Sequence, residues 1–191
     1  YFLGEYAARK GFAFSATNHL IYNLKKPVNR RGRTEWQYKE RAINEAGSAL
    51  RNALTARCIR TATFVPIPPS MSKSDPLYDD RMTKVIQTIR PNAEIDIREL
   101  IVQERTVTAY HSIESSRNPD RIRSLYSIDE ELCEPGPSQI IICDDVLTTG
   151  AHFKAAQNIL SERFPGVQID GVFIARRVPE AEDIQYSNVD F

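Results

Sequence analysis

The stretch from Ile140 to His152 constrains the fold of this chain more than any other; it reads IIICDDVLTTGAH. It begins with an apolar run that is too short to span a membrane and suits a buried parallel strand. Two adjacent carboxylates, Asp144 and Asp145, end that run, and a Thr-Thr-Gly turn then opens an amphipathic helical pattern. At such a turn, backbone N–H groups without partners gather at the positive end of a helix. The stretch therefore predicts a phosphate-binding turn beside an acidic pair that suits hydroxyls and a divalent cation.

The same stretch resembles the phosphoribosyl-pyrophosphate (PRPP) signature of the type I phosphoribosyltransferases, which has an apolar run, two acids, two apolar residues and Thr-Thr-Gly. The resemblance implies an α/β fold with a central, mostly parallel sheet flanked by helices, and a small variable hood from the termini. It implies that Asp144 and Asp145 hold the ribose hydroxyls. It also implies a 5′-phosphate loop made of Thr148, Thr149, Gly150, Ala151 and His152. His152 stands where the family usually has Thr or Ser, so it either donates to the phosphate or points to solvent.

Length and composition fit one domain over residues 1–191. The resemblance implies that this is a phosphoribosyltransferase-like domain with a core at about 60–176. Of the residues, 41% are hydrophobic and 26% are charged, which is ordinary for a globular protein. The net charge is zero, so a general attraction to nucleic acid is not indicated. No apolar stretch is long enough to cross a bilayer, and no membrane partner is expected.

The cysteine pattern argues against a metal or disulfide framework. Cys58, Cys133 and Cys143 are far apart and form no CxxC pair. A reducing cytoplasm is therefore the expected compartment. Cys143 lies inside the apolar run and is expected to behave as a small core hydrophobe.

The order of the expected elements alternates strands with helices, which predicts a parallel sheet. Residues 1–34 are mixed, with a short amphipathic segment at Leu20–Lys26 before a basic turn. The elements expected after them are a helix over Thr34–Arg57 capped by Thr34, a first sheet strand over Thr61–Ile67, a helix from Asp79 or Asp80 to before Pro91, a second strand over Ile95–Val102, a short strand near Leu125–Ile128, a helix over 151–163 and a last strand over Val167–Ala175.

The loop after the Thr61–Ile67 strand combines prolines with serines and a lysine. Its hydroxyls and ammonium group suit an anion, although a plain polar turn has the same composition. In the family this loop receives pyrophosphate, often through a cis peptide. The resemblance thus assigns pyrophosphate binding to Ser70, Met71, Ser72 and Lys73.

A long polar connection runs from Gln103 to Arg123. Connections of this length inside compact domains are usually functional lids or disordered segments. A basic lid would exclude water and neutralise charge on a pyrophosphate leaving group, through Arg105 and Arg117. The alternative is a solvated helix with ordinary surface arginines.

Parts of the connection resemble one subgroup, the ComF type of phosphoribosyltransferase-like proteins. The similar segments are Thr106–His111, Arg117-Asn118 and Leu125-Tyr126, together with Leu20–Lys26 near the start. Members of that group usually carry an N-terminal zinc-binding cysteine cluster, and this chain lacks one.

The resemblance implies an Mg²⁺-dependent transfer of phosphoribosyl from PRPP to a nucleobase or amine, with release of pyrophosphate. Mg²⁺ would be held through PRPP, with Asp144 or Asp145 as the only candidate protein ligands. Val146, Arg176 and Tyr186 are candidate acceptor contacts, and plain packing is the alternative for Tyr186. The branch that resembles hypoxanthine phosphoribosyltransferase has Asp at the position of Thr148, so salvage of 6-oxopurines is not expected.

Two other functions remain open at this stage. One is a non-catalytic PRPP- or nucleotide-binding regulator or adaptor of the ComF type, acting through a protein partner or single-stranded DNA. The basic cluster Arg30–Arg33 suits the DNA version, although a solvated loop is the simpler interpretation. The other is a structural relic of the fold, against which the intact acidic pair argues. A homodimer is compatible with either function.

Overall fold

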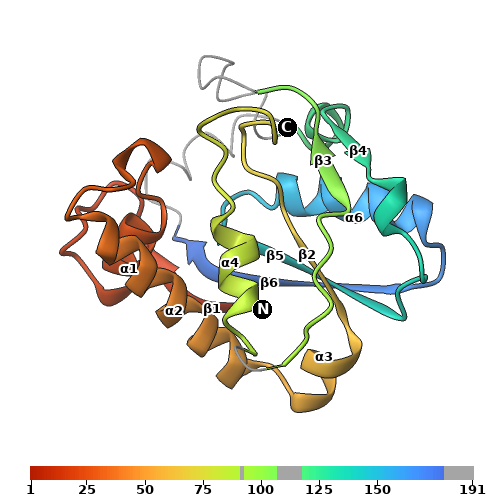
Figure 1. The fold of residues 1–191 in the computed structure, drawn as a ribbon, viewed down its shortest axis with the longest axis horizontal. Helices are drawn as coiled ribbons and strands as arrows, with labels where there is room; N and C mark the ends of the chain where they lie inside the picture. The colour runs from red at the N-terminus through yellow and green to blue at the C-terminus, as the bar shows by residue number, and fades with distance from the viewer. Residues whose placement is uncertain (91–92, 107–117, 179–191) are drawn as a thin grey trace, which may run out of the picture.

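The computed structural model describes residues 1–90, 93–106 and 118–178, and the account below concerns these residues. Its centre is a four-stranded parallel sheet in the order β1-β6-β5-β2 (Figure 1). The strands are β1 (Phe2–Tyr6), β2 (Thr63–Pro66), β5 (Gln139–Leu147) and β6 (Gln168–Arg177). The predicted α/β class with a parallel sheet flanked by helices is confirmed.

Strand β5 is the central element because it pairs with β2 on one side and β6 on the other. Ile142 is in register with Val65 of β2 and with Gly171 of β6. Successive side chains of a strand alternate between the two faces of the sheet. Ile140 and Ile142 accordingly join one hydrophobic cluster, while Ile141 and Cys143 join another. An apolar run with both faces covered is thus why this segment forms a buried strand.

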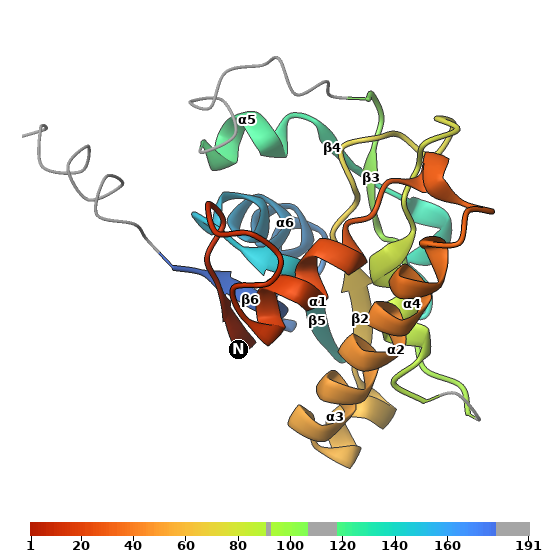
Figure 2. The same ribbon diagram turned by 90° about the vertical axis from the view of Figure 1, so that its left-hand side faces the viewer.

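Helices cover both faces of the sheet. Figure 2 shows α6 (Ala151–Arg163) on one side of the strands and α2 (Trp36–Ala53) and α4 (Arg81–Gln87) on the other. Helix α1 (Ala16–Leu24) packs with α2 and α4 in the same cluster, and α3 (Ala56–Thr61) precedes β2. The part of the chain described here contains no helix long and apolar enough to cross a membrane.

The helix expected over Thr34–Arg57 is two helices. Leu54 is extended and ends α2, and the Thr55 side chain accepts a hydrogen bond from the Cys58 N–H to begin α3. Thr34 was expected as the N-cap, but Glu35 holds that place without a side-chain bond. The predicted helix at 151–163 is confirmed at both ends.

The segment expected as one strand, Ile95–Val102, is divided between two sheets. Its first part extends the parallel sheet, because the Phe64 N–H donates to Asp96 O at 2.8 Å and Arg98 N–H donates to Phe64 O at 3.0 Å. Its last part is β3 (Ile101–Gln103), antiparallel to β4 (Tyr126–Ile128). Helix α5 (Pro119–Arg123) and the short 3-10 turns η1 (Val28–Arg30) and η3 (Glu130–Leu132) complete the described elements.

The expectation that Thr61–Ile67 holds the first sheet strand is wrong, because β1 precedes it. Strand β1 lies at the sheet edge, with Phe2 opposite Phe173 and Gly4 opposite Ala175 of β6. Its sequence, FLGEY, has no run of β-branched residues that would mark a strand. The N-terminal part of the expected hood therefore contributes a strand to the sheet as well as helices.

Helix α2 approaches α4 closely because residue 47 is glycine. A Cβ at Gly47 would lie 2.8 Å from the backbone oxygen of Val85 and would also meet the Thr88 hydroxyl. We expect Gly47→Ala to lower the free energy of unfolding by about 1–3 kcal/mol, because overpacking displaces α4 despite the better helix propensity of alanine. Urea denaturation measures the change. Gly11→Ala, where a Cβ meets nothing within 4 Å, should leave stability nearly unchanged; equal stability of both variants would contradict this packing account.

Candidate functional site

The acidic pair lies near the carboxyl end of β5, where ligands bind in open α/β sheets. The two acids were expected to end the strand, but the strand continues through Leu147 and includes both of them. Because side chains alternate along a strand, the two carboxylates point to opposite faces of the sheet. The structure therefore separates two side chains that were expected to hold the same ribose.

Asp145 faces α4 and the end of α1, and it is 3% exposed. Arg81 donates to its Oδ2 from both Nε at 2.9 Å and Nη2 at 2.6 Å. Lys25 Nζ lies 3.1 Å from its Oδ1. Each carboxylate oxygen thus already has a cationic partner from the protein, and Asp145 holds its neighbours in place in this conformation.

A line of alternating charges continues from Arg81. Its Nη1 donates to Asp79 Oδ2 at 2.8 Å, and Lys39 Nζ donates to the same oxygen at 2.8 Å. Lys39 is 2% exposed and also donates to Leu24 O and Lys26 O at the end of α1. These ion pairs connect β5, α4, α2 and the end of α1, so the acidic pair and the N-terminal helices form one electrostatic unit.

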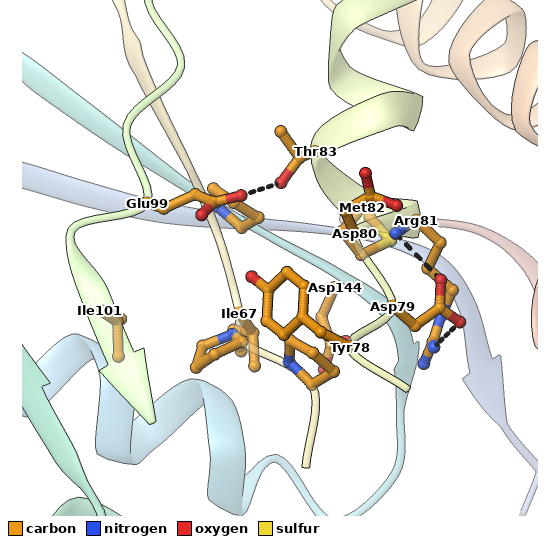
Figure 3. Close-up of a pocket in the computed structure, with 13 residues that line it drawn as sticks. Ile67, Tyr78, Asp79, Asp80, Arg81, Met82, Thr83, Glu99, Ile101 and Asp144 are labelled. Atoms are coloured by element: carbon orange, nitrogen blue, oxygen red, sulfur yellow. Dashed lines mark hydrogen bonds and ion pairs between the residues drawn. The ribbon is translucent and has the colours of Figure 1, made fainter. Parts of the chain in front are cut away.

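Asp144 is half-buried, and it is the acid that lines a hollow. It lines a small hollow of about 40 Å³, bounded by the Pro66–Pro69 turn, Tyr78, the first turn of α4 and Glu99 (Figure 3). Figure 3 shows Tyr78 lying over this hollow and Glu99 accepting from the Thr83 hydroxyl, a bond of 2.6 Å. Besides the bond it accepts from the Asp145 N–H at 2.7 Å, no hydrogen bond to the Asp144 carboxylate joins it to another described residue. We name this space the Asp144 hollow.

The two carboxyl groups differ in the direction of their pKa shifts. Burial, and then the charge of Asp145, raises the pKa of Asp144 to about 7. Burial acts against ionisation of Asp145 too, but Arg81 and Lys25 outweigh it and lower its pKa. A buried pair with opposite shifts is typical of functional sites, because one group is held ionised while the other is poised to change charge.

Asp144 makes a specific contribution to the pH dependence of stability. Its folded pKa lies above its ordinary value of 3.8, so its stabilising effect is complete below that value and is lost as pH rises toward about 7. We expect Asp144→Asn to raise the free energy of unfolding by at least about 1 kcal/mol at pH 8 or so, and by much less at about pH 4. Urea denaturation of both proteins across this range is the measurement. A variant that is less stable at high pH would contradict the assignment.

The predicted phosphate turn joins β5 to α6. Gly150 is the N-cap of α6 with φ of +81°, in the left-handed region that favours glycine. The Thr149 hydroxyl accepts from the Ala151 N–H at 3.4 Å. Thr148 and Thr149 are exposed, while the Ala151 side chain is buried. The turn thus presents two hydroxyls at the start of a thirteen-residue helix, a geometry that suits an anion.

His152 is exposed, as one of the two alternatives expected, but its ring also has a partner in the chain. Its Nδ1 lies 2.8 Å from the hydroxyl of Tyr126, which is 5% exposed. Desolvation by the surrounding chain lowers the pKa of His152, which favours the neutral ring. Burial and then the nearby Asp144 charge raise the pKa of Tyr126. Tyr126 is therefore bonded to the first turn of α6 and is close enough to Asp144 to be affected by its charge.

The predicted pyrophosphate loop lies against the base of the predicted lid. Gln103 Nε2 donates to Ser70 O at 2.8 Å, and the Ser72 N–H donates to the Thr106 hydroxyl at 3.2 Å. Lys73 Nζ pairs with Glu99 at 2.9 Å, beside the Asp144 hollow. The peptide bonds of this loop are trans, and the one cis bond found in the described part of the chain is Glu134–Pro135. The expected cis peptide is thus not present here.

The remaining candidate residues do not all gather at the site. Arg105 is exposed at the base of the lid, and Arg176 is exposed on β6 with its guanidinium 5.8 Å from the Phe2 ring centroid. Val146 is 5% exposed and packs in the core. Arg117 and Tyr186 lie outside the described residues, as does most of the predicted lid.

The cations that pair with Asp145 could not be predicted from the sequence. Arg81 was seen only as part of a helix, and Lys25 only as the end of an amphipathic segment. Arg81 and Asp145 are 64 positions apart, and no local pattern joins them. A signal was present only for Asp79 and Asp80, which were expected at the start of α4.

The chain matches no protein-family model and no curated protein. Three neighbouring features of the structure bear on the function. These are the Asp144 carboxylate, the turn at the start of α6 and the Ser70–Lys73 loop.

Proposed function

We propose that this protein binds PRPP with Mg²⁺ and transfers its phosphoribosyl group to a nucleobase or amine acceptor. The fold is then a type I phosphoribosyltransferase fold with an N-terminal hood. The observation that carries the proposal is the position of Asp144, beside a small hollow and four residues before Thr148, the first residue of the Thr-Thr-Gly turn that begins α6. Such a pairing suits a ligand with a phosphate at one end and hydroxyls next to it.

Each end of the ligand has a separate set of partners. The 5′-phosphate would accept hydrogen bonds from the Thr148 and Thr149 hydroxyls and from the first N–H groups of α6. Since the Asp144 hollow holds only about 40 Å³, the ribose would lie across its mouth with a hydroxyl directed at Asp144. Asp145, paired with Arg81 and Lys25, would fix the geometry of β5 rather than bind the sugar directly.

The leaving group would lie on the Ser70–Lys73 loop. Ser72 and Ser74 place two hydroxyls 3.1 Å apart, and Lys73 supplies a cation that is 42% exposed beside Glu99. Among the described residues no group of three or more His, Cys, Asp or Glu side chains is arranged to hold a metal. The oxygens of PRPP and the Asp144 carboxylate fit Mg²⁺, which keeps few protein ligands; bound there, it would neutralise pyrophosphate charge.

In the proposed reaction the bond from C1 of the ribose to a pyrophosphate oxygen breaks, and a bond from C1 to an acceptor nitrogen forms. Pyrophosphate leaves with the bonding electrons, and the acceptor nitrogen gives up its proton. The positive charge that develops on the ribose ring is stabilised by the nearby Asp144 carboxylate. The buried ion pairs around Asp145 keep β5 fixed while this happens.

A screen for pyrophosphate release tests the catalytic part of the proposal. The protein is mixed with PRPP, Mg²⁺ and each of a panel of nucleobases and amines, and pyrophosphate is measured by a coupled assay. Release that depends on one acceptor is the expected result. Binding of PRPP without release in any mixture would contradict turnover.

A second candidate function is a PRPP-binding regulator or adaptor of the ComF type. The ion pairs of Asp145 favour it, because they leave only one of the two acids free to contact the ribose. This protein would bind PRPP and Mg²⁺ through the same residues and act through a protein or DNA partner. The pyrophosphate assay separates the two functions.

A further inference from the structure

A second, larger hollow lies next to the acidic pair at the N-terminal end of the chain. It has a volume of about 590 Å³ and is formed by the end of β1, the end of α1, η1 and the residue before α2. We call it the N-terminal hollow. Its polar and aromatic lining comes from Tyr6, Tyr22, Lys25, Lys26, Arg30 and Glu35. This size falls within the range of sites that enclose small organic ligands.

The N-terminal hollow is joined to the proposed reaction site through ion pairs and hydrogen bonds. Lys25 lines the hollow and pairs with Asp145 at 3.1 Å, immediately after Asp144 in β5. Lys26 O accepts from the buried Lys39, which is bonded to Asp79 at the rim of the Asp144 hollow. A molecule in the N-terminal hollow would thus contact the ion pairs that hold β5, the strand that carries Asp144, in place.

The charges that line the N-terminal hollow do not balance. Three cations line it against one carboxylate, Glu35. Arg30 lies 3.7 Å from Glu35, and Lys25 is paired with Asp145, so two of the cations have partners. Lys26 has no ion pair with a carboxylate of the described chain, and its ammonium donates to the neutral Asn23 Oδ1 at 3.3 Å. One uncompensated positive charge therefore remains at the wall of the hollow.

Two aromatic rings lie near that charge. Lys26 Nζ lies 5.3 Å from the ring centroid of Tyr22 and 5.9 Å from that of Tyr38. Tyr22 is 58% exposed, so a large part of its ring is open to a ligand. Flat rings favour planar ligands through stacking, and a lysine ammonium favours a carboxylate or another compact anion.

We propose that the N-terminal hollow binds the acceptor, and that the acceptor is a planar aromatic or heteroaromatic anion whose negative group pairs with Lys26. This inference rests on the proposed phosphoribosyl transfer and adds the chemical class of its second substrate. A cationic amine would be repelled by the excess positive charge of the hollow. No carboxylate of the lining pairs with Lys26, and a neutral ring would leave its positive charge without a negative partner.

The test compares matched probes that differ only in charge: nicotinate against nicotinamide, and benzoate against benzamide. Calorimetric titration of the full chain should show each acid binding at least about tenfold more tightly than its amide, since a hydrogen bond to a charged partner has this strength. Lys26→Gln should remove the preference and Lys26→Arg should keep it. Lys154→Gln, at an exposed lysine of α6, is the matched control and should bind as the wild type does.

Equal binding of acid and amide to the wild type would overturn the inference, and so would an unchanged preference in Lys26→Gln. PRPP titrations on the same samples keep the two proposals apart. PRPP binding without acid selectivity contradicts only the acceptor class. Acid selectivity without PRPP binding contradicts the proposed function and leaves the N-terminal hollow as an anion site of another kind.

Discussion

Arg81→Met is expected to lower the free energy of unfolding by about 3 kcal/mol or more, the largest stability effect that we expect from a single substitution in this chain. The change leaves the buried Asp145 with only Lys25, which is 43% exposed on its side chain. It also removes one of the cations bonded to Asp79. Removing one partner of a buried pair is costly because the remaining charge stays desolvated. Urea denaturation at about pH 7.5 is the measurement.

Two comparisons make the Arg81 prediction specific. The double variant Arg81→Met with Asp145→Asn should recover part of the loss, since it removes the uncompensated charge. Arg163→Met breaks an exposed pair with Glu130 and should change stability far less than Arg81→Met does, because solvent screens exposed charges. If Arg81→Met lowers the free energy of unfolding no more than Arg163→Met does, the Arg81–Asp145 ion pair contributes little to stability.

The Arg81 effect should also depend on pH in a defined direction. Arg81 lowers the folded pKa of Asp145 below its ordinary value of 3.8. The stability from such a group is present above that ordinary pKa and is lost as pH falls through the folded pKa. The difference between Arg81→Met and wild type should therefore be largest near neutral pH and shrink as the solution is acidified below about pH 4.

Asp144→Asn is expected to weaken PRPP binding by roughly tenfold to a hundredfold, although the same variant should be more stable than wild type near pH 8. An amide keeps the size of the side chain but loses the charge that we assign to a ribose hydroxyl and Mg²⁺. Calorimetric titration with PRPP and Mg²⁺ measures the change. The opposite signs for affinity and stability are a strong test, because misfolding cannot produce both.

Asp170→Asn is the matched control for Asp144→Asn. The substitution also replaces a carboxylate with an amide, but on the neighbouring strand β6. Asp170 lies opposite Ile141, away from the carboxyl ends of the strands. Its carboxylate accepts from Gln139 and Gln168. PRPP affinity should be unchanged in this variant. An equal loss in both variants would mean that Asp144 has no special place in the site.

Local pattern predicted the centre of the fold well. The apolar run of β5 and the periodicity of α6 are properties of contiguous residues, so both elements could be predicted from the sequence. Strand β1 could not, because its position depends on pairing with β6 more than 160 residues away, as Phe2 with Phe173 shows. The division of Ile95–Val102 between two sheets likewise depends on Phe64 and on β4, which are distant in sequence.

The candidate site was predictable in its residues but not in their roles. The motif indicated Asp144, Asp145 and the phosphate turn together. Because side chains alternate along a strand, the two acids lie on opposite faces of the sheet. The cations that pair with Asp145 come from α4 and the end of α1. The Tyr126–His152 hydrogen bond joins residues that are 26 positions apart, which is why neither possibility considered for His152 included it.

Calorimetric titration of the wild-type chain with PRPP, with and without Mg²⁺, tests the central claim most directly. We predict saturable binding of one PRPP for each chain in the presence of Mg²⁺, and weaker binding without it. Ribose 5-phosphate should compete, because it retains the phosphate and the ribose hydroxyls. No binding of PRPP with Mg²⁺ by the folded protein would contradict the assignment of Asp144 and the Thr148–His152 turn to a phosphoribosyl ligand.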